Sequence, residues 1–160
     1  MTPFVPILAA AALAAAACDV RARRIPNALT GALAIAGVVT AGATHGLSGA
    51  GTAVAILAVL LAAGTVAFAR GWFGGGDIKL LAAGCCGLTP VLAVDFLVYT
   101  ALCGGFLSLY SLAASQRMVT ALITRQLPQT GTRLPYAVAA AGGALLMWVA
   151  LLCPAFLLVR

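Results

Sequence analysis

The sequence predicts an all-α membrane protein with six transmembrane helices, the fourth of them short. Hydrophobic residues make up 64% of the 160 residues, charged residues only 8%, and the mean hydropathy is +1.14. A soluble domain normally carries about 25% charged residues, so this composition excludes that class. The apolar residues also form six separate runs bounded by Gly, Pro or basic residues. We therefore expect a single transmembrane domain over residues 1–160.

The expected spans cover residues 3–18, 28–44, 50–69, 80–87, 91–114 and 135–159. Five of these runs are long enough for a hydrocarbon core about 30 Å thick. The fourth run is too short, because a helix rises only about 1.5 Å per residue, so we expect neighbouring helices to shield it. No Lys or Arg precedes the first run, so we expect an uncleaved helix rather than a secretory signal peptide.

Turn and capping residues separate these runs in order along the chain. Pro26 breaks the helix and Asn27 is suited to cap the next one, so we expect the first two helices to form a hairpin. A turn at residues 44–46, a glycine run at 74–76 and a turn at 88–90 separate the runs that follow. The predicted helices are therefore joined by short connections.

Basic residues indicate the orientation of the chain, because Lys and Arg accumulate on the cytoplasmic side of membrane proteins. With six spans, one side carries Arg21, Arg23, Arg24, Arg70, Lys79, Arg117, Arg125 and Arg133. Only Arg160 falls on the other side, so we expect both termini outside the cytoplasm. Anchoring this topology is a sufficient role for the arginines at 21–24. The basic stretch 115–133 is either a helix at the membrane surface that lines a substrate route or an ordinary loop.

The chain has only three carboxylates, and two of them, Asp19 and Asp77, lie where an apolar run meets a loop on the same predicted side. An ionised acid near the membrane boundary costs free energy unless it is solvated or paired. We interpret these two as one catalytic pair that faces the cytoplasm. The third, Asp95, lies near the external end of the fifth run, where we expect a capping or an interhelical hydrogen bond rather than catalysis.

Three glycines, residues 74–76, precede Asp77. A phosphate-binding loop would need a Lys or a helix start in place of the acid, and dinucleotide binding would need a third spaced glycine and a βαβ unit. The run is either a flexible turn or a device that brings Asp77 close to another carboxylate or to a substrate backbone, and we favour the second. We expect Gly76→Val to impair function more than the same change at Gly49, in an external turn.

Two carboxylates that lie close together do not both ionise readily, so they share one proton. The ionised member can then activate a water, while the protonated member polarises a peptide carbonyl. This chemistry needs no metal and no other cofactor, and the five cysteines include no Cys-x-x-Cys pair for a zinc site. Lys79 either lowers the proton affinity of the pair or extends to the membrane interface, and we favour the second.

Three places in the chain together resemble the motifs of one known family. Asp19 is followed by Ile-Pro-Asn at residues 25–27. The pattern Gly-x-Gly-Asp-x-Lys-Leu is formed by Gly74, Gly76, Asp77, Lys79 and Leu80. A weaker likeness is Pro-Tyr-Ala at residues 135–137. With these motifs the chain resembles the prepilin peptidases, or type IV leader peptidases, which are GxGD intramembrane aspartic proteases; they have glycine in place of the alanine, a difference that affects only packing.

This resemblance implies a peptidase domain in which Asp19 and Asp77 are catalytic and the other motif residues support them. The implied substrate is a prepilin in the bacterial inner membrane, cut on the cytoplasmic side after a glycine that ends its short basic leader. Long family members carry a further domain with two Cys-x-x-Cys pairs; without it, the chain resembles the short form of tight-adherence (Flp-type) pili, which implies cleavage without methylation. The expected partners are the prepilin and the bilayer, without nucleic acid, and the oligomeric state is open.

Three other classes of function remain open. A proton-coupled transporter places acids in membrane helices, but usually near mid-membrane and within internal repeats. A metal-dependent lipid phosphotransferase would need more acids to hold divalent ions, and loss of activity on chelation would indicate it. A non-enzymatic assembly subunit would tolerate the loss of either Asp19 or Asp77.

Overall fold

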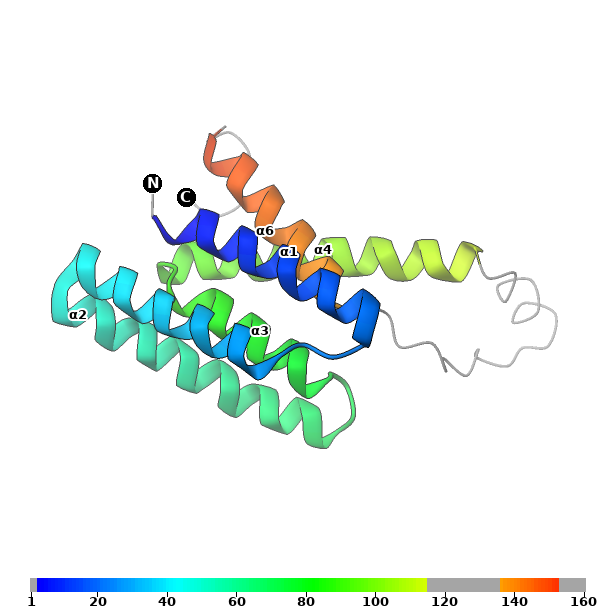
Figure 1. Cartoon of the computed structure of the whole chain (residues 1–160), viewed down its shortest axis with the longest axis horizontal. Helices are drawn as coiled ribbons and strands as arrows, with labels where there is room; N and C mark the ends of the chain where they lie inside the picture. The colour runs from blue at the N-terminus through cyan, green and yellow to red at the C-terminus, as the bar shows by residue number, and fades with distance from the viewer. Residues whose placement is uncertain (1–2, 115–135, 153–160) are drawn as a thin grey trace.

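The computed structural model describes residues 3–114 and 136–152. Within these ranges the chain is all-helical, which confirms the predicted class (Figure 1). The helices are α1 (Phe4–Ala22), α2 (Asn27–Ala69), α3 (Gly75–Cys86), α4 (Pro90–Ala114) and α6 (Tyr136–Leu152). The basic stretch 115–133 lies outside the described residues.

Helix α2 is bent back on itself at Gly46. Its 43 residues would extend about 65 Å as one straight helix, roughly twice the thickness of a hydrocarbon core. At Gly46 the backbone leaves the helical region, with φ 66° and ψ −155°, and the two arms of α2 lie side by side (Figure 1). Only glycine adopts this conformation without strain. The predicted runs 28–44 and 50–69 are therefore the two arms, and the break falls in the predicted turn.

Gly49 does not lie in an open turn, contrary to our expectation. It is buried in the second arm of α2, and a Cβ atom there would overlap the carbonyl oxygen of Ala41 in the first arm. The arms approach this closely because Gly49 has no side chain, so Gly49→Val would disturb the fold itself. Gly51, whose Cβ would meet nothing within 4 Å, is the suitable control for changes in other glycines.

Three described helical segments are long and apolar enough to cross a membrane: α1, α2 and residues Pro90–Ser111 of α4. The described part of α6 is apolar but shorter. Helix α3 has 12 residues, which corresponds to about 18 Å. These helices support a membrane protein, while the six crossings stay a prediction.

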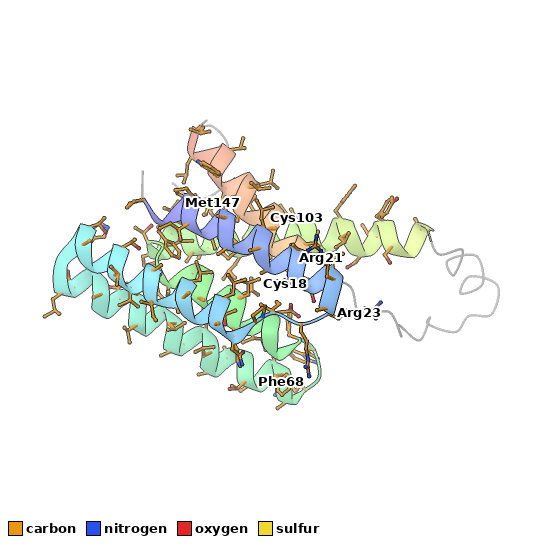
Figure 2. All side chains as sticks on the ribbon, viewed as in Figure 1. Cys18, Arg21, Arg23, Phe68, Cys103 and Met147 are labelled. Atoms are coloured by element: carbon orange, nitrogen blue, oxygen red, sulfur yellow. The ribbon has the colours of Figure 1, made fainter. Side chains whose placement is uncertain are left out.

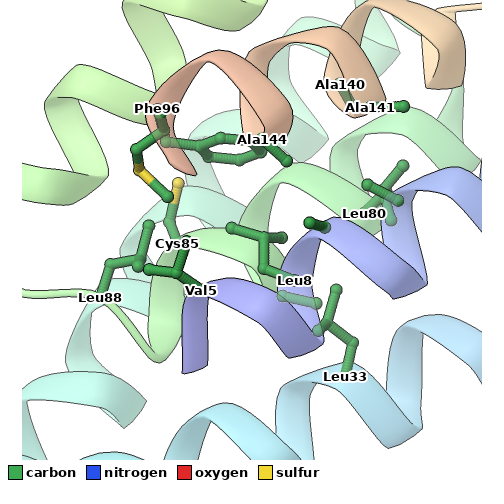
Figure 3. Close-up of a cluster of buried hydrophobic side chains, with 14 of the residues drawn as sticks. Val5, Leu8, Leu33, Leu80, Cys85, Leu88, Phe96, Ala140, Ala141 and Ala144 are labelled. Carbon is green, nitrogen blue, oxygen red and sulfur yellow. The ribbon is translucent and has the colours of Figure 1, made fainter. Parts of the chain in front are cut away.

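The hydrophobic core lies between α1, α3, α4 and α6, and Leu33 of α2 also contributes to it (Figure 3). Its largest fully buried side chains include Phe4, Leu8, Leu80, Phe96 and Met147. Most of the remaining core residues are alanines, whose small side chains permit close contact between helices. Helix α3 packs against α2 as well as against α4 and α6. The core therefore fixes the position of α3, and with it the glycine run at its start.

Candidate active site

Asp19 and Asp77 line the same cavity, of about 600 Å³, although they are far apart in the sequence. Asp19 lies in the last part of α1 and Asp77 in the first turn of α3, and both are partly buried. The cavity is lined by Asp19, Val20, Arg23, Arg24, Ile25, Asn27, Gly74, Gly75, Gly76 and Asp77. It lies at the end of the bundle where Arg23 and Phe68 are labelled in Figure 2, opposite the bend of α2. The two acids and most residues of the first two motifs are thus brought together.

Asp77 is part of α3 and does not precede it in a loop, so the helix begins earlier than the predicted run at residues 80–87. Gly74 is the N-cap, with an extended backbone (φ −74°, ψ 142°), and Asp77 is the third helical residue. A backbone hydrogen bond links Gly74 to the Asp77 carboxylate. An acid at this position caps the helix start and interacts favourably with the helix dipole. This interaction favours a helix start within the glycine run.

The three glycines at the start of α3 have different surroundings. A Cβ atom at Gly74 would lie 2.7 Å from Oδ2 of Asp77, so a side chain there would displace the carboxylate. A Cβ atom at Gly75 would meet only Phe68, at 3.6 Å, and one at Gly76 would meet Ile25, at 3.4 Å. Both of the latter are ordinary contacts. Within the fold, the room for the Asp77 carboxylate therefore depends on Gly74.

The pKa of Asp77 is raised from its ordinary value of 3.8 to about 6. Burial of the carboxylate is the largest cause, and the negative charge of Asp19 adds to it. The backbone hydrogen bond from Gly74 acts in the opposite direction, because it stabilises the ionised form. Asp77 therefore retains a proton at pH values at which an isolated Asp would have lost it.

Two arginines that follow α1 also line the cavity. Helix α1 ends at Ala22, and Arg23 adopts a left-handed conformation (φ 50°, ψ 33°) from which its N–H donates to the carbonyl oxygen of Asp19, at 2.8 Å. Such a conformation is uncommon for a residue other than glycine. It turns the chain so that Arg23 and Arg24 line the cavity with the two acids. We had considered topological anchoring a sufficient role for these arginines. Anchoring alone does not account for their place in the cavity.

A hydrogen bond joins the first motif to the second. Nζ of Lys79 donates to Oδ1 of Asn27, at 3.0 Å, across 52 residues of sequence. Asn27 is the first helical residue of α2 and Pro26 is the N-cap, so the expected capping role of Asn27 is wrong. Neither role considered for Lys79 included this contact. The hydrogen bond ties the start of α2 to α3 beside the cavity.

The third motif lies beside the second. The rings of Tyr136, at the start of α6, and Phe73 pack edge to face with centroids 5.6 Å apart. Tyr136 is also close enough to Asp77 for the charge of the carboxylate to act on it. The sequence signal for this position was Pro-Tyr-Ala at residues 135–137, which we noted only as a weaker likeness to the family motifs. Asp95 is fully buried in α4 and does not line the cavity.

The fold and the site together define a helical membrane protein with two interacting carboxylates in one polar cavity. A sequence model of the type IV leader peptidase family matches residues 6–109. The chain therefore belongs to this family of peptidases, and the resemblance seen in the sequence is confirmed. No curated protein and no solved structure matches the chain. The matched range includes Asp19 and Asp77 and ends before Tyr136.

Proposed function

We propose that the chain is a prepilin leader peptidase that uses Asp19 and Asp77 as a catalytic pair. The observation that carries this proposal is that both acids line one cavity and that the charge of Asp19 contributes to the raised pKa of Asp77. Membership of the type IV leader peptidase family supports peptide hydrolysis in general. Interacting carboxylates with a perturbed pKa are typical of sites that perform acid and base catalysis.

In the proposed mechanism Asp77 holds the shared proton and Asp19 acts as the base. We assign the proton to Asp77 because burial and the charge of Asp19 raise its pKa. Asp19 removes a proton from a water whose oxygen attacks the scissile carbonyl carbon, and Asp77 donates its proton toward the carbonyl oxygen. The C–N bond then breaks as the leaving amine receives a proton from the pair. One water is consumed, and a carboxylate and an amine are formed.

The substrate proposed for this site has a polar segment next to an apolar helix, as a prepilin leader and pilin helix have. Its scissile bond must lie at the membrane boundary, where we place the cavity on the cytoplasmic side of the bacterial inner membrane. The peptide must be locally extended, because a helix engages its carbonyls in hydrogen bonds. A glycine before the cleaved bond favours such unwinding.

The test is processing of a co-expressed prepilin, measured from the size of the pilin on a gel. Asp19→Asn and Asp77→Asn should each lower the cleavage rate by on the order of 10²–10⁴, because each removes an ionisable group from the pair. Membrane insertion and abundance should be nearly unchanged. Asp95→Asn is the matched control, since Asp95 does not line the cavity, and its processing should be retained. Near-normal processing by Asp19→Asn would show that the pair is not the catalytic group.

A further inference from the structure

A second, apolar groove is lined by residues that adjoin those of the polar cavity in the chain. Its volume is about 210 Å³. Its walls include Leu60, Ala63 and Ala67 of the second arm of α2 and Leu97 of α4, and its floor includes Ile78 and Leu81 of α3. Helix α3 packs against both α2 and α4, so the groove runs over a short helix between two longer ones.

The residues that line the two cavities adjoin one another in the chain at the glycine run and Asp77. Residues 74–77 line the polar cavity, whereas their neighbours on either side, Phe73 and Ile78, line the groove. A peptide that crosses from one cavity to the other here would pass from charged surroundings to apolar ones within one or two residues of Asp77. The change in polarity matches a substrate whose polar leader is followed directly by an apolar helix.

The wall formed by α2 has small side chains that leave room for another helix. Ala63 is exposed and Ala67 is partly buried. Gly64 lies between them and is already covered, because a Cβ atom there would overlap the side chain of Ile78. Small residues at such spacing let a second helix backbone approach closely in a membrane.

We propose that this groove binds the apolar helix that follows the cleaved bond of the substrate, while the leader occupies the polar cavity. The inference rests on the proposed function and adds to it the path of the substrate. Another apolar groove, between α4 and α6, is lined by Leu102, Phe106 and Leu146 among others. No residue that lines it adjoins a residue of the polar cavity in the chain, so it serves as a comparison.

Photo-crosslinking in membranes tests the path directly. A benzophenone amino acid would replace Ala63 in the full chain, with Ala62 and Leu102 as control positions; Ala62 is exposed and does not line the groove. The probe is a model precursor with a basic leader ending in glycine and an apolar helix of about 20 residues. Position 63 should crosslink to the precursor several times more than either control. Equal yields, or crosslinks from position 63 only to lipid or to a second copy of the chain, overturn the proposal.

Cleavage kinetics provide an independent test with matched variants. Ala63→Leu should lower kcat/KM for the anchored precursor by roughly tenfold, a change in binding of about 1.4 kcal/mol, whereas Ala62→Leu should stay within about twofold. A soluble peptide that contains the leader but lacks the apolar helix should be cleaved equally by both variants. The groove proposal is overturned if Ala63→Leu does not lower kcat/KM for the anchored precursor, or if it lowers kcat/KM for the soluble peptide equally. If the unaltered chain cleaves neither substrate, the proposed function itself is wrong, and the groove proposal falls with it.

Discussion

At the scale of single residues, Gly74 leaves the space that the Asp77 carboxylate occupies. A Cβ atom at position 74 would lie 2.7 Å from Oδ2 of Asp77, whereas one at position 75 would be 3.6 Å from its nearest neighbour. The backbone angles at Gly74 are open to any residue, so the constraint concerns space for the side chain.

Gly74→Ala should therefore reduce cleavage by about tenfold or more, because it moves the carboxylate that we propose to be catalytic by a fraction of an ångström to an ångström. Gly75→Ala, one residue away, should leave the rate within about twofold. The measurements are the rate of prepilin processing and the unfolding temperature of both variants in detergent. Similar rates of processing for the two variants would indicate that the glycine run is only a flexible turn.

The ionisation of Asp77 should make stability and activity depend on pH. Its pKa in the folded chain is raised from 3.8 to about 6, so the folded state binds this proton more tightly than the unfolded chain does. The resulting stabilisation is fully present below about pH 4 and is lost as the pH rises through about 6. Between pH 4 and 7 we expect the unfolding temperature of the unaltered chain to fall relative to that of Asp77→Asn. The plot of cleavage rate against pH should change slope near pH 6.

The contribution of Asp19 to this pH dependence can be separated from that of burial. Asp19→Asn removes a charge that raises the pKa of Asp77, while the larger effect of burial persists. The loss of stability should still begin near pH 4, but it should be smaller and complete at a lower pH than in the unaltered chain, without vanishing. A pH dependence that is identical in the two proteins would contradict an electrostatic interaction between the acids.

At the scale of helices, the hydrogen bond between Lys79 and Asn27 links the starts of α3 and α2. Both side chains are exposed, so the bond contributes little to global stability, but it holds together the two segments that line the cavity. We expect Lys79→Met and Asn27→Ala each to lower kcat roughly fivefold to tenfold with little change in KM. The double variant should be no worse than either single one, because all three lose the same bond. Additive losses would indicate that the two residues act separately.

The elements differ in how well the sequence predicts them. The start of α4 and the break at Gly46 were predicted, because an apolar run and a turn marked each of them. The start of α3 was missed because three glycines have low helix propensity, whereas the cap formed by Asp77 and packing against α2 stabilise a helix there. The partner of Asn27 could not be predicted, since 52 residues separate it from Lys79.

At the scale of the whole molecule, the convergence of Asp19 and Asp77 was predictable because the chain has only three carboxylates and the charge pattern put these two at one end. The positions of Arg23, Arg24 and Tyr136 were not predictable in this way. They depend on the left-handed turn at Arg23 and on the contact between Tyr136 and Phe73. These are tertiary features without a periodic signal in the sequence.

The two ends of the helix bundle differ in charge, which predicts their sides of the membrane. The end with the polar cavity carries Arg21, Arg23, Arg24, Arg70 and Lys79, whereas the bend of α2 at the other end has no Lys or Arg within residues 41–52. Lys and Arg favour the cytoplasmic side, so the acids should open to the cytoplasm and the bend should lie outside. This orientation is required for the proposed cleavage of a cytoplasmic leader.

Cysteine labelling in intact cells with a membrane-impermeant maleimide tests this orientation. Leu47, beside the bend, is 92% exposed, and Trp72, in the connection between α2 and α3, is 67% exposed; neither lines the polar cavity. Leu47→Cys should be labelled in intact cells, and Trp72→Cys only after the inner membrane is permeabilised, because the reagent does not cross it. The unaltered chain gives the background from its own cysteines, of which Cys85 and Cys86 are buried. The reverse pattern would place the two acids outside the cytoplasm, where they could not cut a leader that stays in the cytoplasm.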